Sequence, residues 1–158
     1  MSHQKEKEDD FYCRYHVFSK GSGFTEFEFT QDGRMKYANK AMGEAIRRHC
    51  NVSPSIIAQI REMVSDSRIL QAIDTKWPAI EPVVGGQEME IRIGNEHISF
   101  TCATINSMAD IDRFYRKENV DLTLNDDPLG LKSFYYLGQD LRALAMALVK
   151  IHYTIKPR

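Results

Sequence analysis

Aromatic and polar residues alternate through the first part of the chain, in the pattern typical of β-strands. Residues 11–19 place one set of side chains on each face of an expected strand, and residues 24–29 alternate Phe with Glu. A turn at 20–23 separates these segments, and Asp32-Gly33 supplies the residues that a tight hairpin needs before a third strand. We therefore expect antiparallel strands with one face on the core and the other in water.

Further strands are expected later in the chain. One spans residues 44–52. Two others, 88–93 and 96–101, flank Gly94-Asn95, a dipeptide that favours a two-residue hairpin. The stretch 77–86 contains prolines and adjacent glycines and is expected to be a loop. The sequence thus predicts about six strands in all.

A first helix is expected to begin at Ser53-Pro54 and to end near Ser67, because serine caps free N–H groups and proline suits the first helical position. Apolar residues recur on one face of this segment at helical spacing. They are Ile56, Ile57, Ile60, Met63 and Val64.

A longer helical pattern, Leu129 to Lys150, follows Asp127-Pro128, which supply a capping aspartate and a proline at the expected first position. One wide stripe of this helix suits a protein core. It comprises Phe134, Leu137, Leu141, Leu144, Ala145 and Leu148. The remaining arc mixes charged residues with Tyr135, Tyr136, Ala143, Met146 and Ala147. This second face indicates packing against another element of the chain or against a separate protein.

Strands followed by helices on one face of their sheet form an α+β fold. We expect residues 1–10 to be a disordered tail and residues 11–158 to form one domain, with two main helices on one sheet face. Within that domain, residues 107–126 are rich in charge, and we expect a solvated insertion with a helical turn at 111–115.

Composition narrows the classes of function. The 21 Lys and Arg residues balance 22 Asp and Glu, so the chain lacks the positive excess that drives binding to phosphate backbones. No apolar run approaches the length of a membrane span, and residues 1–10 do not have the apolar core of a secretory signal. We expect a soluble, intracellular protein that does not bind membranes. Its cysteines, Cys13, Cys50 and Cys102, are expected to be free buried thiols.

No catalytic, cofactor-binding or metal-binding motif is found in the chain. Cys13 and His16 are three residues apart on a strand and so face opposite ways, which disfavours a zinc site with His49 and Cys50. His97 lies within a strand, where a hydrogen-bonded structural histidine is more common than a general base. We therefore expect no enzyme activity, no cofactor and no metal.

Two segments of the chain are distinctive: Glu96-His97-Ile98-Ser99-Phe100-Thr101, and Phe134-Tyr135-Tyr136-Leu137 with Gln139-Asp140-Leu141. Both resemble the Mago nashi family, the small adaptor of the exon junction complex. Shorter matches are collinear from Asp10 to Arg158. They include Asp10-Phe11-Tyr12, Glu26-Phe27-Glu28-Phe29, Tyr37-Ala38-Asn39, Trp77-Pro78 and Ile155-Lys156-Pro157. The chain is thereby identified as a divergent member of that family, with an insertion before the C-terminal helix.

The resemblance implies a flat antiparallel sheet with helices on one face and a non-catalytic adaptor role. Family members form an obligate-like heterodimer with an RRM-containing protein, using their helices to cover the RRM sheet. They serve in splicing-dependent mRNA processing, export, localisation and surveillance, including nonsense-mediated decay. The resemblance thus predicts a nuclear protein that shuttles to the cytoplasm and contacts mRNA only indirectly. The expected RRM-protein contacts are Leu141, Leu144, Met146, Leu148, Ile57 and Arg61.

In the family, the heterodimer also locks a DEAD-box ATPase on RNA, and here the sequence departs from the family pattern. Where family members carry an acidic cluster after the first helix, this chain keeps Asp66 but has Arg68, Ala72 and Ile73. Each lost carboxylate at an exposed rim would cost up to ~1 kcal/mol of pairing. Asp66 and Arg68 are the residues expected at this helicase contact if it is retained.

Two other classes of function stay open at this point. A self-associating structural protein could bury the apolar face of the second helix in a homodimer. A small hydrolase or metal-dependent enzyme could use His97 or the region of His16 and Cys50, although no nucleophile with a nearby base is recognisable. The sequence does not identify the RRM partner, the role of the insertion or the source of nuclear import.

Overall fold

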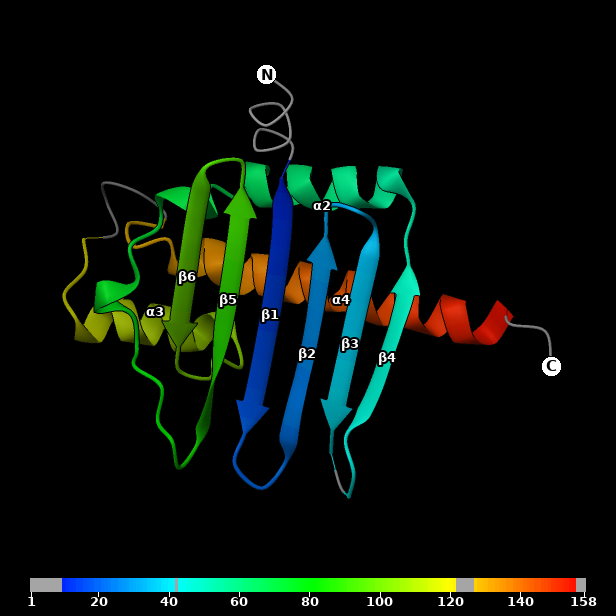
Figure 1. Ribbon diagram of the computed structural model, residues 1–158. Helices are drawn as coiled ribbons and strands as arrows, with labels where there is room; N and C mark the ends of the chain where they lie inside the picture. The colour runs from blue at the N-terminus through cyan, green and yellow to red at the C-terminus, as the bar shows by residue number, and fades with distance from the viewer. Residues whose placement is uncertain (1–9, 42, 122–126, 156–158) are drawn as a thin grey trace.

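Six antiparallel strands form a single sheet in the order β4-β3-β2-β1-β5-β6, as the computed structural model shows (Figure 1). The structure describes residues 10–41, 43–121 and 127–155, with side chains as far as residue 152. The strands are β1 (Phe11–Ser19), β2 (Gly23–Thr30), β3 (Arg34–Lys40), β4 (Ile46–Asn51), β5 (Gly85–Ile93) and β6 (Glu96–Cys102). This sheet confirms the predicted α+β class and the expected antiparallel pairing.

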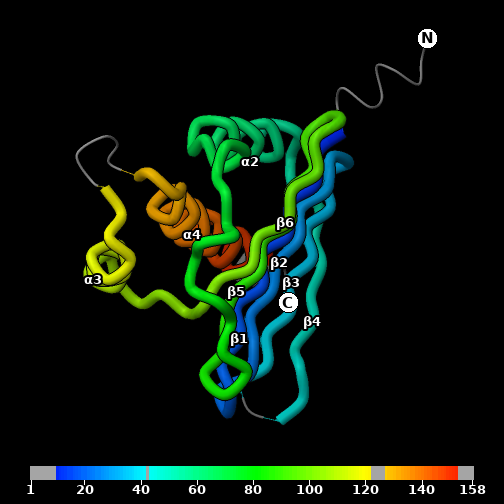
Figure 2. Tube along the Cα trace, turned by 90° about the vertical axis from the view of Figure 1, so that its left-hand side faces the viewer, coloured from blue at the N-terminus to red at the C-terminus, as the bar shows by residue number. Residues whose placement is uncertain are grey.

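The helices lie on one face of this sheet. In the described residues they are α2 (Pro54–Asp66), α3 (Met108–Lys117) and α4 (Leu131–Ile155), with 3-10 turns at η1 (Ile69–Gln71) and η2 (Asp74–Lys76). α4 runs across the back of the strands, α2 lies beside it, and α3 lies on the side of α4 away from the sheet (Figures 1 and 2). The opposite face of the sheet carries no described helix. No helix in the described ranges is long and apolar enough to cross a membrane.

The core forms between the helices and the strand residues that face them. Phe134 of α4 packs against Trp77 and Phe100, with ring centroids 4.8 and 6.1 Å away. The Trp77 indole N–H also donates to the backbone oxygen of Leu129 at 2.9 Å, which satisfies the polar group of a buried ring. The loop before β5 is thereby fixed to the start of α4.

α2 begins and ends as predicted. The Ser53 hydroxyl accepts a hydrogen bond from the Ile56 N–H at 3.4 Å, and Pro54 occupies the start of the helix. The helix ends at Asp66. Three of its predicted apolar residues, Ile57, Ile60 and Val64, are buried against the core.

α4 begins later than predicted, at Leu131 rather than Leu129. Gly130 has a φ of +77°, a conformation that suits glycine, and it separates Pro128 from the helix. The capping residue is nevertheless Asp127, whose carboxylate accepts the N–H groups of Lys132 and Ser133 at 2.9 Å each. The helix continues beyond Lys150 to Ile155.

The charged insertion contains more structure than the predicted helical turn at 111–115. Residues 108–117 form α3, whose Ile111 and Tyr115 are buried because they pack against the start of α4. The Tyr115 hydroxyl donates to Asp127 Oδ1 at 2.8 Å, and burial together with this bond raises the pKa of Tyr115. The prediction of a merely solvated insertion is therefore wrong for α3, while residues 122–126 lie outside the described part, as do residues 1–9 of the predicted tail.

Strand boundaries differ from prediction by a few residues. β5 begins at Gly85 instead of residue 88, because Gly85 and Gly86 pair with Ser19 and Phe18 at the end of β1. The predicted hairpin at Gly94-Asn95 is confirmed, since Ile93 pairs with Glu96 across it.

Candidate partner-binding site

The outward side of α4 carries exposed apolar side chains at positions where a soluble helix usually has polar ones. Tyr136 is 50% exposed, Met146 42% and Ile151 54%. With one residue every ~100° around the helix, Tyr136 lies on the arc opposite the buried Phe134 and Leu141, together with the exposed Ala143 and Ala147. Ile151 lies about 60° further round, at the margin of this arc. Apolar side chains in such an arrangement mark a surface that another protein can cover.

A groove of about 400 Å³ lies between α2 and α4 beside this arc. The residues that line this α2–α4 groove are Met63, Asp66, Ser67, Ser133, Tyr136, Leu137 and Asp140. Met63, Tyr136 and Leu137 supply apolar surface, and Asp66 and Asp140 supply carboxylates. The groove can therefore accept an apolar or aromatic side chain and hold a basic group at its rim.

The predicted partner contacts at Leu141 and Ile57 need correction. Leu141 is 0% exposed and Ile57 is 1% exposed, so neither side chain has surface to offer a partner. Both face the sheet, because α4 and α2 turn their widest apolar stripes inward to form the core. Leu141 and Ile57 thus support the helical layer from inside.

Leu144, Leu148 and Met146 divide between two flanks of α4. Leu144 and Leu148 are partly buried and pack against the core with one side of each side chain. Met146 is exposed and lies roughly 160° from Leu144, because two residues span ~200° of helix. The structure therefore does not gather these predicted contacts on one patch, although all three reach the surface of the helical layer.

The other predicted contacts lie at the end of α2 and beyond it. Arg61 is half-buried and does not line the α2–α4 groove. Asp66 does line it. Arg68 is exposed, has a left-handed backbone with a φ of 59°, and lines a neighbouring hollow of about 220 Å³ with Ile73 and Asp127 among others. Asp66 and Arg68 therefore lie at adjacent but separate surface hollows.

Sequence reasoning did not select Tyr136, Ile151 or Met63, although the structure places them at this surface. Tyr136 belongs to the mixed second face of the predicted helix, and Ile151 lies beyond the predicted helix end. Met63 was assigned to the core face of α2, and it does pack partly against the core.

The residues of the alternative enzyme hypothesis are not brought together. His97 is exposed, and its Nε2 lies 2.9 Å from Glu90 Oε1. His16 lies on the open sheet face, 3.6 Å from Glu26, whereas Cys50 faces the helices with its sulfur 3.9 Å from that of Met35. Within the described ranges, no group of three His, Cys, Asp or Glu residues is arranged to hold a metal ion.

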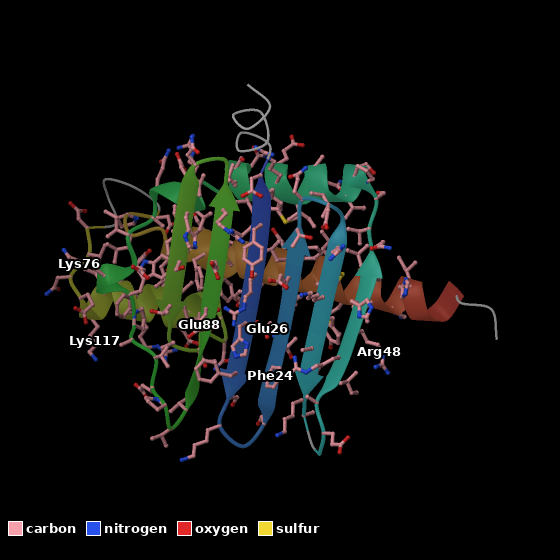
Figure 3. All side chains as sticks on the ribbon, viewed as in Figure 1. Phe24, Glu26, Arg48, Lys76, Glu88 and Lys117 are labelled. Atoms are coloured by element: carbon pink, nitrogen blue, oxygen red, sulfur yellow. The ribbon has the colours of Figure 1, made fainter. Side chains whose placement is uncertain are left out.

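The open face of the sheet is covered by paired charges. Glu26 and Glu88 project from β2 and β5 on either side of β1 (Figure 3). Arg14 of β1 forms an ion pair with Glu26 and lies 3.9 Å from Glu88, and Lys36 lies 3.8 Å from Glu28. Such a face is well solvated. The helical face, with its exposed apolar residues, is the better candidate for a stable protein interface.

Comparison with known proteins decides the family. The sequence profile described as Mago nashi protein matches residues 11–158 of this chain. A curated relative, Protein mago nashi homolog of Arabidopsis thaliana, is 40% identical over 158 residues, which covers 96% of this chain and 97% of the relative. The chain belongs to the Mago nashi family. This confirms the resemblance stated from the sequence.

The two segments that carried the resemblance occupy defined places in this Mago nashi fold. Residues 96–101 form most of β6, at one edge of the sheet, and residues 134–141 lie in the first half of α4. Phe100 and Phe134 from these segments are both buried and lie in the same aromatic cluster. The segment in α4 also contributes Tyr136 and Asp140 to the α2–α4 groove.

Proposed function

We propose that this chain is a non-catalytic adaptor that forms a heterodimer with an RRM-containing protein. In this form it serves as a core subunit of the exon junction complex on spliced mRNA, where it supports mRNA processing, export and surveillance. The observation that carries the proposal is the exposed apolar arc of α4 beside the α2–α4 groove, in a chain of the Mago nashi family.

The physical argument rests on the two faces of the domain. On the open face of the sheet the charged side chains pair with one another. A partner that covered this face would have to remove water from these ion pairs or break them. Covering Tyr136, Met146 and Ile151 removes apolar surface from water, at roughly 25 cal/mol per Å². An RRM sheet is itself rich in aromatic side chains. Such a sheet would find apolar partners and two carboxylates on the helical layer.

The pairing is tested by recovery of partners from native cell extract after nuclease treatment. Tagged wild-type protein is compared with Ile151→Arg and with Leu148→Arg by mass spectrometry. Val83→Arg is the matched control, because Val83 is also an exposed apolar residue, at 70%, but lies in the loop before β5. We expect an RRM protein to be recovered with wild type and with Val83→Arg, and to be lost with both helix variants.

Two results would contradict the proposal. One is recovery of no RRM protein with wild type, and the other is equal recovery with all variants. Light scattering of the purified chain at several concentrations measures its molar mass, and so distinguishes a self-associating protein from a subunit of a heterodimer. A homodimer that Ile151→Arg dissociates would mean that the helical face binds a second copy instead.

We also propose that the heterodimer is nuclear, shuttles to the cytoplasm and contacts mRNA only through its partners. A DEAD-box ATPase is the further partner proposed at the surface near Asp66 and Arg68. The same pull-down tests this contact, using Asp66→Lys and Arg68→Glu. Loss of a DEAD-box protein with retention of the RRM protein would support a contact there, and its absence from the wild-type sample would contradict one.

A further inference from the structure

The two edges of the sheet differ in whether another part of the chain covers them. At the β6 edge, the outward backbone N–H of Thr101 donates to Asp74 Oδ2 at 3.3 Å, and η2 contacts this strand. At the β4 edge, no described element lies beside the strand in the plane of the sheet (Figure 1). An uncovered edge presents backbone donors and acceptors that can pair with another extended chain.

The register of β4 identifies its outward groups. The Val52 N–H donates to Gly33 O at 2.7 Å, which fixes the alternation of hydrogen bonds between β3 and β4. Cys50, Arg48 and Ile46 then bond inward to β3. The backbone groups of Arg47, His49 and Asn51 therefore point outward. Of these, the Arg47 oxygen accepts a hydrogen bond from Arg48 Nη1 at 3.0 Å, which places a guanidinium at the same edge.

Charge alternates along the rows of side chains that cross the open face. In one row, Glu90 of β5, Arg14 of β1, Glu28 of β2 and Lys36 of β3 lie side by side, and His49 of β4 ends the row. Arg14 and Lys36 thus each have an acidic neighbour on an adjacent strand. His49 has no strand on its outer side to supply one.

The next row ends in the same way. It runs through Glu88, His16, Glu26 and Ala38 to Arg47. Arg47 is exposed, and in the described part of the chain its side chain has no ion pair or hydrogen bond. The outer strand therefore has two arginines and a histidine, Arg47, Arg48 and His49, with no acidic residue in the strand itself.

A depression lies beside this edge on the open face. Its volume is about 330 Å³, and its lining includes Arg47 and His49 of β4, Lys36 and Ala38 of β3, and Glu26 and Glu28 of β2. The methyl group of Ala38 is the shortest side chain in its row, which leaves the space open. A side chain of a strand added outside β4 would lie next to Arg47 and His49, and β3 separates these two residues from Glu26 and Glu28 on β2.

We propose that the β4 edge binds an extended acidic segment of another protein by β-strand addition. Outward backbone groups of Arg47, His49 and Asn51 bond to this segment, and its alternate acidic side chains lie opposite Arg47 and His49. Charge complementarity selects this occupant. A second copy of β4 would place the same basic residues against each other, which is unfavourable. The surface is separate from the helical face used in the proposed function.

The probe for this site is a short fluorescent peptide of alternating glutamate and valine, titrated against the full chain by anisotropy. A peptide with lysine in place of glutamate is the charge control. Arg47→Glu should weaken binding by about tenfold or more, because it turns an attraction into a repulsion at an exposed position.

Backbone bonding is tested by two substitutions that both remove the His49 imidazole. His49→Pro also removes an outward N–H, without removing a bond to β3, and His49→Asn keeps that N–H and is the matched control. In the peptide, N-methylation of the glutamates blocks the N–H groups that face β4, whereas N-methylation of the valines blocks those that face away. We expect His49→Pro to weaken binding more than His49→Asn does, and glutamate methylation to weaken it more than valine methylation does.

The methylated peptides keep the test decisive if His49→Pro fails to fold. Equal affinity of the two methylated peptides would overturn strand addition, and so would binding that Arg47→Glu leaves unchanged. Binding of an oligouridylate with no binding of the acidic peptide would show a general polyanion site and would also overturn the proposal.

Discussion

Replacing Asp127 with alanine should destabilise the domain by more than an ordinary surface substitution, because one carboxylate joins α3 to α4. It accepts the Tyr115 hydroxyl at 2.8 Å, the N–H groups of Lys132 and Ser133 at 2.9 Å each, and the Ser133 hydroxyl at 2.7 Å. Loss of a helix cap costs about 1 kcal/mol. Leaving the hydroxyl of a buried tyrosine without its partner costs about 1–3 kcal/mol more.

We therefore expect Asp127→Ala to lower the free energy of unfolding by about 2–4 kcal/mol, measured by urea denaturation with circular dichroism. Asp127→Asn keeps one oxygen acceptor and should lose roughly half as much. A double-mutant cycle with Tyr115→Phe isolates the link between the helices. Removing the hydroxyl should be costly in wild type and nearly neutral, or stabilising, in Asp127→Ala.

A loss below about 0.5 kcal/mol for Asp127→Ala would refute this reasoning, since that is the range of substitutions away from structural contacts. Additivity of Asp127→Ala and Tyr115→Phe would refute the coupling. The carboxylate would then act as a helix cap only, and α3 would be held by its buried apolar residues.

Two further predictions concern the buried face of the sheet. Burial raises the pKa of Cys13 and of Cys102 from 9.0 to about 12, so the folded state disfavours both thiolates. Stability present below pH 9.0 should be lost as the pH rises toward 12, by about 1.4 kcal/mol per thiol at about pH 10. Replacing both cysteines with alanine should flatten the pH dependence of urea unfolding between about pH 8 and pH 10, and an unchanged slope would contradict the assignment. A second change, Gly138→Ala, would place a Cβ 2.8 Å from Tyr15 Oη. Overpacking of about 1–3 kcal/mol should outweigh the gain of about 1 kcal/mol in helix propensity, and a variant more stable than wild type in the same assay would contradict this packing.

Much of the fold could be predicted from the sequence because its signals are local. Asp32-Gly33 and Gly94-Asn95 mark hairpins that the structure contains, and Ser53-Pro54 marks the start of α2. α3 was underestimated because its apolar positions, including Ile111 and Tyr115, are few among charged residues. These residues are buried because the start of α4 lies beside them, and a local sequence pattern does not predict such a tertiary contact.

The site was harder to predict because exposure depends on tertiary packing. The helical wheel placed Leu141, Leu144 and Leu148 on one stripe, and the structure buries the first fully and the others partly. How much of that stripe is covered depends on where α2 lies. The outer position of β4 was likewise not predictable, since strand order is decided by pairings between distant segments.

The central claim is that the helical face, and not the open sheet face, pairs with an RRM protein. Its most direct test is the dissociation constant of the purified heterodimer, measured for Met146→Arg, Ile151→Arg, Val83→Arg and, on the open face, Glu88→Arg. The account predicts that Ile151→Arg and Met146→Arg weaken binding by about 100-fold or more, with Val83→Arg and Glu88→Arg within about threefold of wild type. Unchanged affinity for both helix variants together with a large loss for Glu88→Arg would contradict it.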